Sequence, residues 1–184
     1  MESACIGLAA LIISMGAAIM AVDPLLQMIY GRPKIYIEFI RSPSESSCTL
    51  WYYLYNLPIR SNLLDRLGIY RRTAEDVFIT FSIWDENNKR WIGEKANAAI
   101  RLNGEEDRRI SLSSSGAPAR CRIVEATTKG GAVVIGRKEN TTYSPPLKAS
   151  NYRVDITVAY AGGRIKLQKG FSVGKTPADL HWLK

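Results

Sequence analysis

The sequence has few of the residues that build metal centres and nucleophilic active sites. Of its 184 residues only one is histidine and three are cysteine, and no Cys-x-x-Cys pair occurs. A structural zinc site needs several such ligands close together. Nucleophilic catalysis by Ser or Cys usually needs a neighbouring base, and the single imidazole, His181, lies in a C-terminal tail that we expect to fray. We predict no metal, no cofactor and no catalytic residue, and the sequence leans against an enzyme.

The acidic residues leave two alternatives open. A membrane-bound hydrolase could use a pair of carboxylates, but nothing in the sequence selects a pair. The acidic segments 85–88 and 105–107 could share a calcium site if they lay at one end of the fold. The glycine pairs at 130–131 and 162–163 have no following helix or Lys-Ser/Thr, so we interpret them as hairpin turns and not as a phosphate loop.

Charge is absent from the first part of the chain. Between Glu2 and Asp23 lie 20 consecutive uncharged residues, most of them Ala, Ile, Leu, Met, Val or Gly. At ~1.5 Å per residue such a helix is ~30 Å long, about the thickness of a bilayer core. The sequence therefore predicts a single transmembrane helix that anchors the protein to the lipid bilayer.

A cleaved signal peptide is the alternative to a retained anchor. It would make the protein a secreted or periplasmic β-domain. Signal peptides begin with basic residues and have a short apolar core, whereas this chain begins Met1-Glu2-Ser3 and its apolar run is long. After the run come Arg32, Lys34 and Arg41, with no basic residue before it. The sequence therefore predicts a single-pass membrane protein, and by the positive-inside rule we expect its domain to face the cytoplasm.

Small residues recur on one face of the predicted anchor, at alternating steps of three and four, which is the spacing at which helices approach closely. This face is a candidate homodimer contact; its members are Gly7, Ala10, Ser14, Ala17 and Ala21.

Basic residues are concentrated in the C-terminal part. The whole chain carries 25 basic and 17 acidic residues, for a net charge of +8. Residues 111–184 contain 12 basic and 4 acidic residues, which gives +8 in that part alone. This half could attract anionic lipid or an acidic protein. Nucleic acid is disfavoured, because a nucleic-acid platform needs exposed aromatic residues between the charges.

Strand signals dominate the chain after residue 31. Alternating or β-prone segments occur at 34–40, 49–57, 77–84, 98–102, 109–112, 121–126 and 132–135, and a hairpin joins 152–160 to 164–173. One short helix, capped by Ser61 and ended at Gly68, is inserted between them, and we expect its leucines to pack on the sheet.

About nine short strands with almost no helix predict a mainly β fold. We predict an antiparallel β-sandwich of immunoglobulin-like type, with a closed barrel as the alternative. The predicted organisation is a membrane anchor with a short interfacial segment at 1–31, the β-sandwich domain at 32–175, and a C-terminal tail at 176–184 that adds a capped helical turn.

The last hairpin is the best candidate binding surface. Arg164 and Lys166 project from one face, with Ile165 and Leu167 behind them, and Arg153 lies on the matching face of the neighbouring strand. The competing interpretation is an exposed sheet face whose basic residues only prevent aggregation. A non-enzymatic binding or scaffolding module is the function that the sequence favours. Whether Cys48 and Cys121 form a disulfide stays open at this point.

Overall fold

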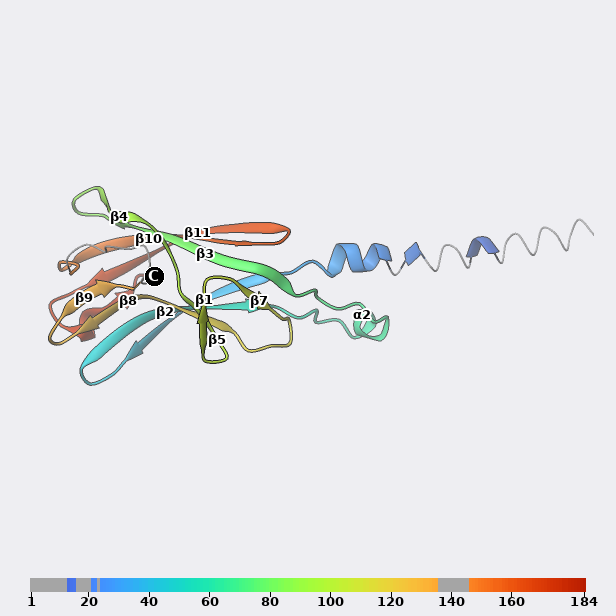
Figure 1. The fold of residues 1–184 in the computed structure, drawn as a ribbon, viewed down its shortest axis with the longest axis horizontal. Coiled ribbons are helices and arrows are strands. Elements are labelled where there is room, and N and C mark those ends of the chain that lie inside the picture. Colours follow the sequence, from blue (N-terminus) through green and yellow to red (C-terminus); the bar gives the residue numbers. More distant parts are fainter. Residues whose placement is uncertain (1–12, 16–20, 23, 136–145) are drawn as a thin grey trace, which may run out of the picture.

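The protein is mainly β, with two antiparallel sheets packed face to face as a sandwich (Figure 1). We describe a computed structural model, which covers residues 13–15, 21–22, 24–135 and 146–184. These residues contain twelve strands, against about nine expected; the additional ones are 90–97, which a glycine interrupts, and the very short strands 105–107 and 181–182. The β-sandwich prediction is confirmed.

The first sheet has the order β1-β2-β8-β5-β6, and β9 pairs with β8. All its pairings are antiparallel. Its strands are β1 (Ile35–Pro43), β2 (Ser47–Asn56), β5 (Ile100–Leu102), β6 (Glu105–Asp107), β8 (Ala119–Thr127) and β9 (Gly131–Val134).

The second sheet has the order β12-β11-β10-β3-β4, and β7 pairs with β3. Its pairings are also antiparallel. Its strands are β3 (Ala74–Asp85), β4 (Arg90–Asn97), β7 (Ile110–Leu112), β10 (Ser150–Tyr160), β11 (Gly163–Val173) and β12 (His181–Trp182). The β10–β11 hairpin turns through Ala161 and Gly162, the latter at φ +95°, one residue earlier than the expected glycine pair.

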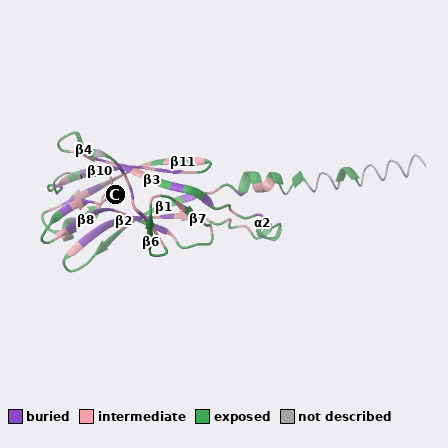
Figure 2. Ribbon diagram, in the orientation of Figure 1, coloured by how far each residue is buried: buried purple, intermediate pink, exposed green. Residues whose placement is uncertain are grey.

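Strand alternation forms the core. From Val77 to Asp85 every second residue of β3 is buried, and these residues include the four expected to share the inner face: Val77, Ile79, Phe81 and Ile83. Their counterparts on β10 and β2 are buried in the same way (Figure 2). At ~25 cal/mol per Å² of apolar surface, this shared layer is the main stabilising contribution to the fold.

The two described cysteines do not form a disulfide. Both are buried and free. On β2 Cys48 pairs with Ala126, whereas Cys121 pairs with Tyr52, four residues further along β2. That offset is ~13 Å along a strand, about twice the Cα separation that a disulfide can bridge.

The short helix α2 (Asn62–Arg66) forms where expected, with the Ser61 side chain accepting a hydrogen bond from the Leu64 N–H and Gly68 at φ +69°. The expectation that it packs on the sheet is wrong. The helix buries none of its residues, and it lies beyond the end of the sandwich, beside the N-terminal segment (Figures 1 and 2). The Ser61 cap and the turn at Gly68 specify a helix, but its five residues span too short a length to reach back over the sheet.

Residues 24–30 are helical and lead into the sandwich. Within the part of the chain that the structure describes, no helix has the length and apolar character needed to cross a membrane. The uncharged run at 3–22 and its small-residue face lie mostly outside the described residues, so the predicted anchor stays a prediction.

The C-terminal segment joins the two sheets, and the expectation that it frays is wrong. A 3₁₀ turn (Pro177–Asp179) forms with the expected capping box, and β12 then pairs with β11 of the second sheet. From the first sheet, Arg41 donates hydrogen bonds to the carbonyls of Leu180 (2.7 Å) and Ala178 (2.6 Å). Leu180 is fully buried.

Trp182 completes this closure. Its indole N–H donates to the Ile40 carbonyl (3.1 Å) on β1, and its ring packs edge-on against Phe39 of the first sheet and Phe171 of the second, at centroid distances of 4.8 and 6.1 Å. The last residues therefore hold both sheets together, because one aromatic side chain contacts each sheet.

We predict that Trp182→Ala lowers the free energy of unfolding by about 2–3 kcal/mol, because it removes a large side chain from between the sheets. Urea denaturation followed by circular dichroism measures the change. Trp91→Ala is the matched control, since Trp91 is 48% exposed, and it should cost less than about 1 kcal/mol. Equal losses for the two variants would contradict the bridging role of Trp182.

Candidate functional site

The outer face of the second sheet carries the candidate binding surface. Register places Thr157 of β10 between Lys166 of β11 and Thr80 of β3. One step along, Asp155 lies between Gln168 and Ser82. Because all these side chains alternate with buried ones, they point away from the core to solvent. The predicted face of Arg164 and Lys166 is therefore part of a polar surface that spans four strands.

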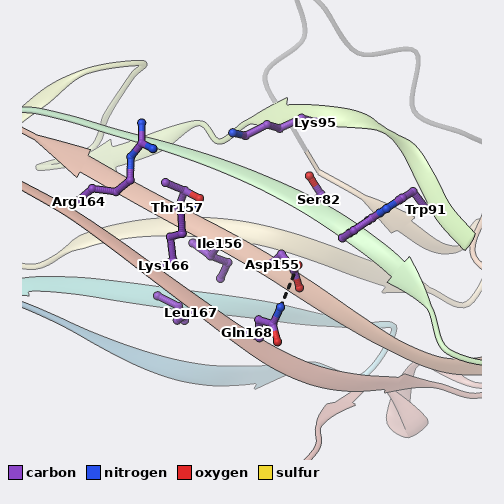
Figure 3. A pocket seen from close by; sticks show the side chains of 10 residues that line it. All are labelled: Ser82, Trp91, Lys95, Asp155, Ile156, Thr157, Arg164, Lys166, Leu167 and Gln168. Atoms are coloured by element: carbon purple, nitrogen blue, oxygen red, sulfur yellow. Dashed lines mark hydrogen bonds between the residues drawn. The ribbon is translucent and has the colours of Figure 1, made fainter.

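This face is hollowed. A depression of about 580 Å³ opens over β4, β3, β10 and β11, and Figure 3 shows the side chains around it. Three of them are cations: Lys95 from β4, and Arg164 and Lys166 from β11. In Figure 3 the Lys95 side chain runs over the sheet toward Arg164. We call these three residues the cationic triplet.

The cationic triplet has no ionic partner in the described part of the chain. The ion pairs formed there involve other residues, and none includes Lys95, Arg164 or Lys166. Arg164 and Lys166 are two residues apart on one strand, which separates their Cα atoms by ~7 Å. The triplet therefore presents three charges that a ligand with several anionic groups can neutralise.

Arg153 lies on the same outer face, as predicted, but its charge is already neutralised. Its guanidinium contacts Asp155 at 3.0 Å and Glu86 at 3.5 Å, and it lies 5.8 Å from the Trp84 ring centroid. Asp155 also accepts a hydrogen bond from Gln168 (3.1 Å). These contacts form one edge of the hollow, so Arg153 holds the neighbouring groups in place and leaves the free positive charge to the cationic triplet.

Two residues of the hollow, Lys95 and Trp91, were not found from the sequence. Both lie on β4, whose glycine and mixed pattern did not suggest a strand. Trp91 is half exposed and stacks edge-on against Trp84 at 5.1 Å. The signal that could have found them is the exposed Trp-x-x-x-Lys spacing directly after the turn that follows β3. This spacing indicates a site only after β4 is paired with β3, because the pairing brings both side chains to the hollow.

A buried carboxylate fixes the turn that positions β4. Asp85 is 3% exposed, and its two oxygens accept hydrogen bonds from the Asn87 N–H (3.0 Å), the Asn88 N–H (3.1 Å) and the Asn88 side-chain amide (2.7 Å), with Ser150 also donating (3.3 Å). Burial by itself raises the pKa of Asp85, but these hydrogen bonds to the charged form outweigh it and lower the pKa below its ordinary value.

The described residues contain few buried groups that could serve in hydrolytic, metal or thiol chemistry. Asp85 is the one buried carboxylate among them, so the inward-pointing pair that a hydrolase would need is not seen there. They also contain no group of three or more His, Cys, Asp or Glu side chains placed to hold a metal ion. Burial raises the pKa of the Cys121 thiol far above its ordinary value, so this cysteine is not a nucleophile at neutral pH.

Comparison with known proteins adds no family assignment. No protein-family model matches the chain, and no curated protein matches it. The functional argument therefore rests on the residues and their geometry alone.

We predict that Asp85→Asn destabilises the protein by about 1–2 kcal/mol at pH 7, because the NH2 group that replaces one carboxylate oxygen cannot accept the hydrogen bond that the Asn88 side-chain amide donates to Asp85 Oδ2. The pKa of Asp85 is lowered in the folded state, so its stabilising contribution is complete above the unfolded-state pKa, ~4, and is lost as the pH falls through the folded-state value. The difference from wild type should shrink below about pH 4.

Urea denaturation at pH 3 to 7 measures this dependence. Asp65→Asn is the matched control, because Asp65 is exposed on α2, and it should change the stability by less than about 0.5 kcal/mol at any pH. A pH-independent loss in Asp85→Asn would show that the hydrogen bonds do not depend on the ionised carboxylate.

Proposed function

We propose that this protein is a single-pass membrane-anchored β-sandwich that works as a non-enzymatic binding module, and that its ligand is an acidic segment of a partner protein. The observation that carries the proposal is the cationic triplet of Lys95, Arg164 and Lys166, which surrounds an open hollow without ionic partners in the described residues. Complementary charge steers an acidic partner to such a face and fixes its register.

The shape of the hollow favours a protein segment over a small molecule. Pockets for small ligands enclose most of the ligand surface, whereas this depression lies on the outer face of a sheet and is open to solvent (Figure 3). The half-exposed Trp91 at its rim suits an interface, because tryptophan buries a large area and is enriched where binding energy is concentrated. An extended acidic chain could lie along the hollow and contact all three cations.

The immunoglobulin-like arrangement is also part of the proposal. The orders β1-β2-β8-β5 and β4-β3-β10-β11 follow the A-B-E-D and C′-C-F-G orders of that fold class. In addition, the buried Tyr152 near the start of β10 donates a hydrogen bond to the Lys148 carbonyl (2.9 Å), four residues upstream. This is the geometry of the tyrosine corner at the start of strand F. In this class of fold, sheet faces and loops commonly serve in protein recognition.

The anchor and its orientation rest on the sequence. The uncharged 20-residue run and the basic residues that follow it support a retained transmembrane helix with the domain in the cytoplasm. A homodimer contact through the small-residue face of that helix is part of the same hypothesis. The rival is a secreted or periplasmic domain released by signal cleavage.

We predict that the protein stays in the membrane pellet after extraction with alkaline carbonate, and that its N-terminus is intact at Met1 or Glu2. In sealed right-side-out vesicles the domain should be protected from added protease, because it faces the interior. Extraction, N-terminal sequencing and protease protection measure these three properties. A soluble protein that begins near Val22 would replace the anchor with a cleaved signal peptide, and digestion of the domain would reverse the orientation.

We predict that the triple variant Lys95→Gln, Arg164→Gln, Lys166→Gln binds a fluorescein-labelled 12-residue polyglutamate peptide about tenfold more weakly than wild type, because three unpaired cations are removed. Fluorescence anisotropy with the full-length protein in neutral nanodiscs measures the affinity, and binding to wild type should weaken as salt rises.

The matched control removes the same number of charges elsewhere. Lys89, Lys129 and Lys175 are exposed and lie outside the hollow. The triple variant Lys89→Gln, Lys129→Gln, Lys175→Gln should keep the affinity within about twofold of wild type, since none of these lysines lines the hollow. Equal losses in the two triple variants would mean that the peptide responds only to net charge, and would overturn the site.

A further inference from the structure

Most of the exposed large hydrophobic side chains of the described residues belong to two segments at one end of the molecule. Thirteen large hydrophobic side chains are exposed among the described residues, and all except Phe78 and Trp91 belong to residues 13–36 or 63–70. Elsewhere in the described residues a large hydrophobic side chain is exposed only at these two positions, so this clustering is not an effect of overall composition. A contiguous apolar patch on a folded domain marks an interaction site.

The helix α2 places its apolar residues outward. Leu63 and Leu67 are four residues apart, so they share one face of the helix, and they are 68% and 45% exposed. Tyr70, which follows, is 69% exposed. Since α2 buries none of its own residues, these side chains contribute nothing to the core. These exposed side chains therefore do not stabilise the domain, and they are available for contact with a partner or a membrane.

Positive charge surrounds the same patch. Residues 24–36 and 57–73 together hold six basic residues and one acidic residue, Asp65, for a local charge of +5. None of the ion pairs of the described chain includes these basic residues. The six are Arg32, Lys34, Arg60, Arg66, Arg71 and Arg72. Apolar residues ringed by unpaired cations fit the surface of an anionic bilayer, which offers acyl chains below negative headgroups.

Arg71 ties the α2 segment to the end of the N-terminal helical segment. Its guanidinium donates to the carbonyls of Tyr30 (2.9 Å), Arg32 (2.8 Å) and Leu57 (3.2 Å). These acceptors are uncharged, so the hydrogen bonds leave its positive charge in place. The side chain of Gln27 donates to the Tyr70 carbonyl (2.8 Å) from the helical side. The two segments, 43 residues apart in sequence at this contact, are therefore held side by side.

The junction itself is closely fitted. The Arg72 N–H donates to the Gly31 carbonyl (2.8 Å), and Gly31 is buried. A Cβ atom at Gly31 would collide with the side chain and the carbonyl of Gln27. The fit lets the chain leave residues 24–30 and enter the sandwich at a defined angle, so that α2 stands at the level of residues 24–30 (Figure 1).

Two hollows flank the junction and are lined by the same kinds of residue. One, of about 450 Å³, is lined by Lys34, Arg60 and Arg71 together with Tyr36. The other, of about 910 Å³, is lined by Arg32 and Arg72 together with Tyr70 and Tyr160, and also by one acidic residue, Glu75. Arginine beside tyrosine suits the headgroup region, where guanidinium groups bind phosphate and amphipathic rings collect.

We propose that α2, with Tyr70 and the surrounding arginines, is a second membrane contact that docks on the anionic headgroup surface of the bilayer carrying the anchor. Leu63 and Leu67 enter the outer acyl region, and Arg60, Arg66 and Arg72 bind lipid phosphates. This contact rests on the proposed anchor, and it fixes the orientation of the sandwich, so that the hollow with the cationic triplet faces sideways along the membrane.

The test uses the full-length protein in vesicles, with a nitrobenzoxadiazole label at Asn62→Cys on α2 or at Asn87→Cys in the β3–β4 turn, both in a Cys5→Ser background. Nitroxides on lipid headgroups should quench the label at position 62 about twofold in vesicles with 30% phosphatidylserine and leave the label at position 87 nearly unchanged. Pure phosphatidylcholine vesicles should give weaker quenching at position 62, because the charge attraction is missing.

The variant Arg60→Gln, Arg66→Gln, Arg72→Gln should lose most of the quenching at position 62. The control variant Lys89→Gln, Lys129→Gln, Lys175→Gln has the same charge change at other surface sites and should keep the quenching.

Carbonate extraction of the same vesicles tests the anchor separately. A protein that resists extraction but shows no quenching at position 62 overturns this contact and leaves the anchor intact. Quenching that survives in a protein removed by carbonate supports the contact and overturns the anchor. Label self-quenching that rises with protein density in place of lipid quenching assigns the patch to a second copy of the chain and overturns the membrane contact.

Discussion

The burial of one face of each sheet against the other is the constraint on which the rest of the structure depends. Because successive side chains on a strand point to opposite sides, burying Val77, Ile79, Phe81 and Ile83 of β3 forces Thr80 and Ser82 outward. The same alternation on β11 turns Arg164 and Lys166 to solvent. The candidate binding face is thus a direct consequence of the core, and a shift of one residue in any strand would destroy both together.

The C-terminal segment and the segment that contains α2 differ in where they place their apolar side chains. The C-terminal residues add to the core, since Leu180 is buried and Trp182 contacts aromatic rings of both sheets. The segment that contains α2 does the reverse, because it presents Leu63, Leu67 and Tyr70 to solvent. Clustered apolar side chains of this kind are typical of a surface that contacts a partner or a membrane. The end of the molecule near residues 24–30 therefore differs in kind from the polar faces of the sandwich.

The basic residues of the two proposed sites differ in whether their charge is paired. Arg153 is held by Asp155 and Glu86, so it builds the rim of the hollow, whereas the cationic triplet is left unpaired in the described residues. At the other site Arg71 uses its donors on three uncharged carbonyls and keeps its charge. Two separate cationic regions follow, one on the second sheet and one beside α2. The proposed acidic ligand and the proposed bilayer contact can then be occupied at the same time.

The sequence by itself determined the long strands, their inward and outward faces, the hairpin of residues 152–173 and the shared face of Arg153, Arg164 and Lys166. These follow from the period of two within each strand and from a short glycine-containing turn that pairs two strands adjacent in sequence. Only the tertiary structure decided what depends on pairing between distant strands. It brought Lys95 and Trp91 of β4 to the hollow, separated Cys48 from Cys121 along β2, placed the last residues between the sheets and moved α2 away from them. Local periodicity carries no information about which strand lies next to which, and those neighbours set the site.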